Sequence, residues 1–387
     1  MKALKEQVEK EKQNGVTGGG YSVELGESHS RTGANLNKVY EQLARESGAA
    51  KTTAEINKLN GALDRQSSAL GKAFKAFTIY NIIVKSAKKA LREAVTTIKD
   101  LDKYLTEQAM VTGKTRKETY ALVGEYQKLA KETGATTKEI AGVATEYMKQ
   151  GKTIQESLTL TKAAVSAAKV ARVSVGDSVN YLTTALNGFR LSAEDAMKVS
   201  DKFAAVAASS ATDYDELAIA LSKVASQANL AGMSIDYTTA LLTKGLETTR
   251  EAPETMGTAL KTIIARMREM SDYGETLEDG TDINNVETQL AYVGITLRNT
   301  EGELRSTEDV LDELGRKWET LDKNQQAAVA KALAGTRQQS RLIAMMEDYD
   351  RVIELQEIAQ RSQGATLAQS ETYLEGIEAA INNISVA

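Results

Sequence analysis

The stretch Ala211–Met270, ATDYDELAIALSKVASQANLAGMSIDYTTALLTKGLETTREAPETMGTALKTIIARMREM, indicates the fold class because it divides into helices with start and stop signals. Asp213 followed by Glu216 has the spacing of a capping box, and Gly232 and Ser234 mark a helix end and a new start. Apolar residues at helical spacing line one face of each segment: Leu217, Leu221, Val224 and Ala228, then Met256, Leu260, Ile263, Ile264, Met267 and Met270. The pattern predicts an all-α fold.

Composition agrees with a helical protein and limits the chemistry. The 387 residues include one proline, Pro253, and aromatic residues make up only 5%. Proline is the main helix breaker, so its scarcity favours long helical runs. The net charge of −5 gives no general attraction to nucleic acid. Because cysteine is absent, disulfides, thiolate catalysis and cysteine metal sites are excluded, and we expect a soluble protein made in a reducing cytosol.

Three blocks of sequence carry a family resemblance. They are TDYDELAIALSKVASQANLAGMS at 212–234, MGTALKTIIARM at 256–267, and LDELGRKWETLDKNQQAAVAKALAGTRQQSRLIAMMED at 311–348. Together, and in this order, they resemble the core module of phage tail tape measure proteins, over about residues 100–350. Several ordered blocks are more specific than any single short motif.

The resemblance implies a structural tail protein of a phage or prophage. Such a protein templates the length of the tail tube, occupies the tube lumen in the virion and is assembled in the host bacterial cytoplasm. The implied partners are the tail tube protein, tail assembly chaperones and distal tail or baseplate proteins. Contact with DNA or membrane at genome ejection is implied as well.

Residues 52–110 read as one long heptad-patterned helix that begins at a Thr52/Glu55 capping pair. Steps of 3 and 4 connect a seam that is apolar at every position except Gln66: Ile56, Leu59, Leu63, Gln66, Leu70, Ala73, Phe77, Tyr80, Val84, Ala87, Leu91, Ala94, Ile98, Leu101 and Leu105. Such a seam predicts either self-association through 56–105 into a coiled coil or packing against the chain's own later helices. The basic face Lys85–Arg92 is either a solvated flank or a contact for an acidic surface.

The rest of the chain is divided by composition. We expect a flexible N-terminal segment with short helices at 1–51, because residues 14–35 are rich in Gly, Ser, Thr and Asn. Residues 111–353 are the expected core helical domain, and 354–387 the start of a further helical region. Within the core, 271–289 reads as an acidic loop, and one small β-hairpin is expected at 295–305 around the NTEG turn.

Helix boundaries in the core follow from capping pairs and glycines. The pairs are Thr115/Glu118, Thr136/Glu139, Thr153/Glu156, Ser174/Asp177, Ser192/Asp195, Ser306/Asp309, Asp322/Gln325 and Thr336/Gln339. The expected stops are Gly113, Gly134, Gly151, Gly188 and Gly335. We expect Trp318 to anchor the core, and Arg337 and Arg341 to bond neighbouring carbonyls or carboxylates.

A search for reactive motifs favours a protein without catalytic, cofactor-binding or metal-binding residues. His29 has no candidate partner near it, and Asp279 and Asp282 do not have the spacing of an EF-hand loop. Gly113–Thr115 and Gly151–Thr153 lack the earlier glycine of a phosphate-binding loop. Two alternatives to a scaffold remain: a membrane-active helical effector, and a cell-wall-degrading enzyme that uses a carboxylate pair.

Overall fold

A computed structural model describes residues 96, 98–268 and 284–374, which belong to one compact unit spanning 95–387. The predicted flexible segment 1–51 and most of the predicted helix 52–110 lie outside the described residues. Within the described part the secondary structure is helical, which confirms the all-α prediction. The predicted domain boundary at 110/111 stays a prediction.

The first half of the described unit starts with a helix at residues 98–112, which we call the entry helix. It is followed by α5 (Arg116–Ala121), α6 (Val123–Thr133), α7 (Thr137–Lys149), α8 (Ile154–Ala171), α9 (Val175–Phe189), η1 (Ala193–Asp195), α10 (Ala196–Ala208) and α11 (Tyr214–Leu230). The second half contains α12 (Ile235–Thr249), α13 (Pro253–Arg268), α14 (Asn284–Tyr292), α15 (Thr307–Lys317), η2 (Trp318–Thr320), α16 (Lys323–Met346), α17 (Asp350–Gln360) and α18 (Ala365–Leu374).

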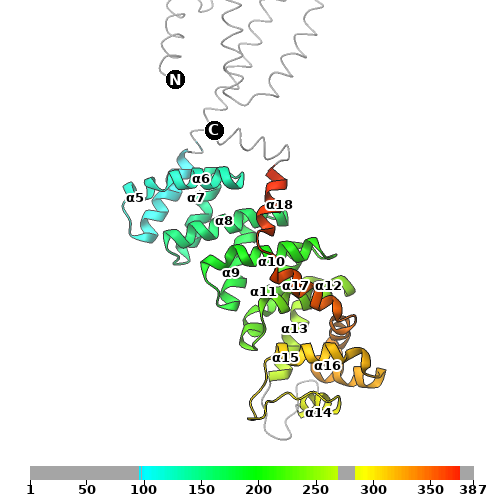
Figure 1. Ribbon diagram of the computed structural model, residues 1–387. Helices are drawn as coiled ribbons and strands as arrows, with labels where there is room; N and C mark the ends of the chain where they lie inside the picture. The colour runs from blue at the N-terminus through cyan, green and yellow to red at the C-terminus, as the bar shows by residue number, and fades with distance from the viewer. Residues whose placement is uncertain (1–95, 97, 269–283, 375–387) are drawn as a thin grey trace, which may run out of the picture. The chain divides into compact units, whose positions relative to one another are not determined.

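The chain runs away from its starting point and then returns along the same helices (Figure 1). On the outward path α8 packs on α9 and α10, α9 on α11, and α11 on α12 and α13. On the return path α16 contacts α13 and α12, α17 contacts α12 and α10, and α18 contacts α10 and α8. We call α17 and α18 together (350–374) the return segment.

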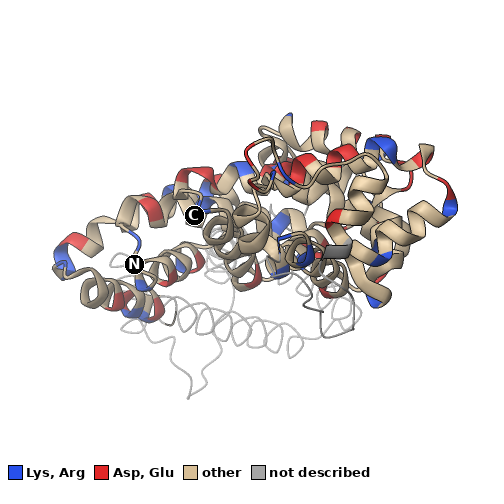
Figure 2. Ribbon diagram, turned by 90° about the horizontal axis from the view of Figure 1, so that it is seen from below, with Lys and Arg blue, Asp and Glu red and all other residues tan. Residues whose placement is uncertain are grey.

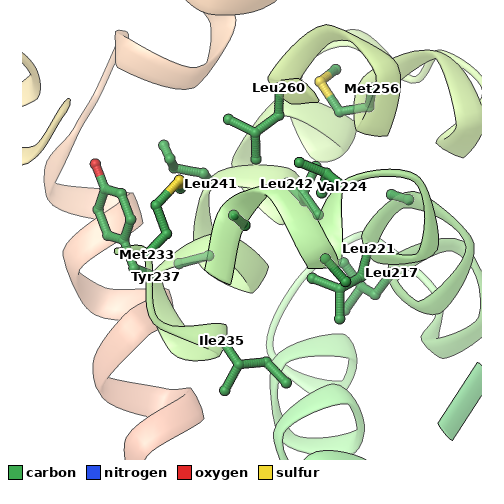
Figure 3. Close-up of a cluster of buried hydrophobic side chains, with 14 of the residues drawn as sticks. Leu217, Leu221, Val224, Met233, Ile235, Tyr237, Leu241, Leu242, Met256 and Leu260 are labelled. Atoms are coloured by element: carbon green, nitrogen blue, oxygen red, sulfur yellow. The ribbon is translucent and has the colours of Figure 1, made fainter. Parts of the chain in front are cut away.

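Two hydrophobic cores lie on the two sides of α8. The smaller core is built by the entry helix, α6 and α7, with Val165 of α8 completing it. The larger core extends from α8 to α17, and Leu160 of α8 belongs to it. Its centre is the packing of α11, α12 and α13 shown in Figure 3, where Leu221, Leu241 and Leu260 are completely or almost completely buried. The apolar stripes that the sequence predicts in 211–270 therefore form the main core as far as Met267, and Met270 lies outside the described residues.

Most of the predicted helix starts are confirmed by their hydrogen bonds. Reciprocal capping boxes close the N-termini of α5, α7 and α8 at Thr115, Thr136 and Thr153. Asp213 and Asp322 cap α11 and α16 in the same way. Each box satisfies main-chain N–H groups that a helix leaves without partners, so these polar residues fix where the helices begin.

Among the predicted glycine stops, Gly188 does not end its helix, whereas Gly335 does. Gly188 lies inside α9, where an added Cβ would be 2.4 Å from the Cβ of Ala225, so its role is the close approach of α9 to α11. The helix ends at Arg190 instead. Gly335 (φ 68°, ψ 172°) confirms the predicted stop, because its non-helical backbone separates two helices that together make up α16, and the second of them ends at Met346. This backbone conformation is accessible almost only to glycine.

The predicted β-hairpin at 295–305 is wrong. The described residues there form a turn that is closed by a single antiparallel bridge between Arg298 and Leu304. The Asn299 side-chain oxygen accepts hydrogen bonds from the N–H groups of Glu301 (3.0 Å) and Glu303 (2.9 Å), so the turn is stabilised locally. The predicted loop 271–289 also ends earlier than expected, because α14 starts at Asn284.

Candidate functional surface

The first and the last described helix are both attached near the turn between α6 and α7. At the entry, Asp100 pairs with Lys138 at the start of α7 (2.6 Å). At the exit, the ammonium of Lys169 lies 5.0 Å from the ring centre of Tyr373 and donates to the carbonyl of Gly134 (2.9 Å). Both ends of the described chain thus lie beside the turn between α6 and α7 (Figure 1).

The entry helix lies parallel to α7 and carries the last positions of the predicted seam. Leu105 is 1% exposed and belongs to the smaller core, whereas Ile98 is 66% exposed. Gln108, one step further along the same 3-4 spacing, is completely buried and bonded on both sides of its amide. The C-terminal end of the seam therefore packs against the chain's own helices. Going back along the entry helix from Leu105 to Ile98, the seam residues change from buried to exposed.

The exit end is held by a polar cluster on α10. The carboxylate of Asp201, 3% exposed, accepts hydrogen bonds from the N–H groups of Gly364 (2.8 Å) and Thr366 (2.9 Å). These donors are at the N-terminus of α18, so a side chain from a distant helix supplies its cap. The hydroxyl of Thr366 donates to Ser200 (2.9 Å), which also accepts from Tyr214 (3.0 Å).

Charged side chains hold α17. The guanidinium of Arg351 pairs with Glu247 (3.2 Å) and Glu354 (2.7 Å) and donates to the carbonyl of Ser209 (2.6 Å). Burial alone would lower the pKa of Arg351, but the hydrogen bonds to the two glutamates outweigh it and raise the pKa. Arg351 is therefore a permanent cation that joins α17 to α12 and to the end of α10.

A buried tyrosine pair lies at the start of the return segment. The hydroxyls of Tyr237 and Tyr349 are 2.8 Å apart, and Tyr349 donates to the carboxylate of Asp312 (3.0 Å). Burial raises the pKa of both tyrosines well above the usual value, so both hydroxyls stay protonated at neutral pH. Gly315 leaves room for this arrangement, since a Cβ there would lie 2.2 Å from the Tyr349 ring.

A surface groove of about 610 Å³ lies between α10 and the return segment. The charged residues that line it already have partners: Glu354 pairs with Arg351 on α17 (2.7 Å), and Glu357 pairs with Arg361 just after α17 (2.8 Å). Figure 2 shows acidic and basic residues interspersed along the helices rather than separated by sign. In the described ranges, no group of three or more His, Cys, Asp or Glu residues is placed to hold a metal ion. Among these same residues, no helix is long and apolar enough to cross a membrane.

The structure confirms the predicted roles of some of the residues that the sequence analysis named, and others lie outside the described residues. Trp318 is 1% exposed in the larger core, which confirms its anchoring role. Arg341 pairs with Glu251 and donates to the Arg337 carbonyl (3.0 Å), as expected for a structural arginine. His29, Asp279, Asp282 and the Lys85–Arg92 face lie outside the described residues.

Sequence reasoning missed the polar cluster on α10. Asp201 and its donors are more than 160 positions apart, so no local pattern connects them. One signal was available: Ser200 and Asp201 interrupt an otherwise apolar face formed by Val199, Phe203 and Ala204.

Comparison with known proteins supports a role in a virus tail. No solved structure matches the chain. Residues 125–335 match the family described as phage-related minor tail protein, which covers more than half of the 387 residues and extends from α6 to the glycine within α16. The chain belongs to the family of phage-related minor tail proteins and is a structural component of a phage tail.

Proposed function

We propose that the protein is the tape measure of the tail, which sets the length of the tail tube and occupies its lumen. The observation that carries the proposal is the continuity between the predicted seam and the folded body. Leu101 and Leu105 belong to the seam in sequence and to the smaller core or its border in the structure. A helix that extends from 56 toward 105 therefore has a fixed attachment at the body.

The physical basis of length control is the constant rise of a helix. An α-helix extends by 1.5 Å per residue, so the number of residues between two attachment points determines a distance. The folded body supplies one attachment. We propose that the tube protein, the tail assembly chaperones and the distal tail or baseplate proteins bind along and beyond the seam during assembly in the host cytoplasm. Self-association through 56–105, and contact with DNA or membrane at ejection, belong to the same proposal.

The test is an in-frame deletion that preserves the seam. Removing residues 63–90 deletes four heptads, so Leu59 is followed by Leu91 with the 3-4 spacing intact. We expect tails that are shorter by up to ~42 Å, measured by electron microscopy of negatively stained particles. The matched control replaces 63–90 with 28 residues of an unrelated heptad repeat, and we expect tails of the original length.

The outcomes separate the proposal from the family assignment. Tails of unchanged length after the deletion would rule out the tape measure role and leave the family membership intact. The described residues add no observation in favour of the membrane-active or wall-degrading alternatives.

A further inference from the structure

α18 is attached to the body almost without apolar burial. Of residues 365–373, the buried ones are Thr366 and Ser370, both small and polar, while Leu367 is 38% exposed. By contrast, α11 buries Leu217, Leu221 and Val224. Hydrophobic stabilisation grows with the apolar area that is buried, so α18 gains little of it from docking.

Specific polar bonds therefore supply most of what holds α18. They are the two N–H donors to Asp201, the Thr366 hydroxyl on Ser200, and the Gln369 amide on the carbonyl of Ala204 (3.1 Å). Near the other end of α18, the Tyr373 ring adds its contact with the ammonium of Lys169 (5.0 Å). A hydrogen bond to a charged acceptor such as the Asp201 carboxylate is stronger than one between two neutral groups. Because these bonds depend on one geometry, the loss of the Asp201 contact weakens all of them.

The connection between α17 and α18 allows movement of α18 alone. Residues 361–364 join the two helices, and Gly364 has φ +85°, a conformation that favours glycine. On the other side of this connection, α17 buries Val352, Leu355 and Ala359 in the larger core. Residues 361–364 thus separate α17, which is anchored by buried apolar side chains, from α18, which is not.

We propose that α18 is a detachable strap, which leaves the body as a unit while both hydrophobic cores stay folded. Its release opens the exit end beside the turn between α6 and α7, where the entry helix also begins. A force that pulls on the chain before the entry helix and on the chain after α18 acts at this end of the body first. The body therefore opens stepwise, beginning with α18. The inference does not depend on the tape measure role.

Hydrogen–deuterium exchange of the complete chain, read out by mass spectrometry, tests this directly. We expect amides in 367–373 to exchange at least about tenfold faster than those in 217–228, because local opening exposes α18 without global unfolding. Exchange of α18 at the same rate as α11 would overturn the proposal.

Two variants identify what holds the strap. Asp201→Asn keeps the size of the side chain but replaces one acceptor oxygen with a donor that faces an N–H group, so exchange should accelerate in 362–373 and stay unchanged in α11 and α13. Asp195→Asn is the matched control, because Asp195 bonds only to Ser192 and Lys198 near the start of the same helix. Equal acceleration in every helix for Asp201→Asn would contradict the strap.

An engineered disulfide that ties α18 to α10 tests the proposal by holding the strap in place instead of weakening its attachment. The chain has no cysteine, and the side-chain oxygens of Ser200 and Thr366 are 2.9 Å apart, so Ser200→Cys with Thr366→Cys introduces one defined bridge. Oxidation should slow exchange in α18, and reduction should restore it. Identical exchange in the two redox states of a chain whose bridge is verified by mass would refute the detachment of α18.

Discussion

Gly257 packs directly against the main-chain carbonyl of Ala220, where α13 crosses α11. A Cβ added to Gly257 would lie 2.2 Å from that carbonyl oxygen and 2.9 Å from the Cβ of Lys223. Only glycine allows the two helices to approach so closely. Gly257 belongs to the MGTAL block that carries the resemblance to tape measure proteins. The close contact between α13 and α11 explains why a glycine stands at this position of the block.

Gly257→Ala should destabilise the body, because the obstacle is backbone and one of the two helices must shift. We expect the unfolding free energy to fall by about 1–3 kcal/mol, measured by urea denaturation. Gly124→Ala is the matched control, since Gly124 is helical and has nothing within 4 Å of an added Cβ. The control should leave stability unchanged or raise it by up to about 1 kcal/mol. Equal effects of the two substitutions would contradict the close crossing.

Arg172→Gly and Arg190→Gly should each stabilise the protein. Both arginines are exposed and end their helices with positive φ, 56° and 55°. The left-handed conformation costs a non-glycine residue about 1–2 kcal/mol, part of which is offset by the greater freedom of glycine in the unfolded chain. We expect a net gain of about 0.5–1 kcal/mol for each substitution in thermal denaturation. Arg250→Gly should gain less despite a φ of 56°, because the Arg250 guanidinium also donates to the carbonyl of Ala211.

Gln108→Leu should loosen the entry helix. The Gln108 amide donates to the Ala141 carbonyl (3.2 Å) and the Thr145 hydroxyl (2.9 Å), and its oxygen accepts from Tyr126 (2.8 Å). Leucine leaves the buried Tyr126 hydroxyl without this acceptor, at a cost of about 1–3 kcal/mol. Adding Tyr126→Phe removes that hydroxyl, so the double variant should lose less stability than the sum of the single losses. Strict additivity would show that the two side chains do not interact.

Acid should weaken the fold partly through Glu313. Hydrogen bonds from Lys317 and then from Arg305 lower the pKa of Glu313 below its ordinary value of 4.5. A carboxylate with a depressed folded-state pKa contributes stability above its unfolded pKa, and this contribution is lost as the pH falls through the folded pKa. Below about pH 5 the melting temperature should therefore fall less steeply for Glu313→Gln than for the natural sequence. Glu319→Gln, at an exposed position in η2, is the matched control for the removal of one carboxylate.

Helix starts could be predicted from sequence because capping is local. Thr136 and Glu139 satisfy each other's backbone groups within three residues, so the motif is sufficient to place the start of α7. The role of a glycine could not be predicted in the same way. Gly134 ends a helix with φ 62°, whereas Gly188 serves the contact with Ala225, which is distant in sequence.

The predicted hairpin at 295–305 is wrong because side-chain contacts in the turn could not be read from the alternation of residues. Its alternation and turn residues suit a strand pair, but the Asn299 side chain closes the turn, and pairing stops at the bridge between Arg298 and Leu304. Most of the contacts that hold the return segment could not be predicted from sequence. Asp201 and Arg351 each bind groups that are more than 100 positions away in the chain, so no local pattern connects them.

Asp100 and Tyr373 are both linked to the region of the turn between α6 and α7, Asp100 through Lys138 and Tyr373 through Lys169, which has a consequence for how such a module tolerates changes in the chain around it. A module whose two ends emerge side by side can be inserted into a longer polypeptide, or have residues added to either flank, without strain in its interior. Residues added to or removed from either flank should therefore leave the packing inside the folded module unchanged.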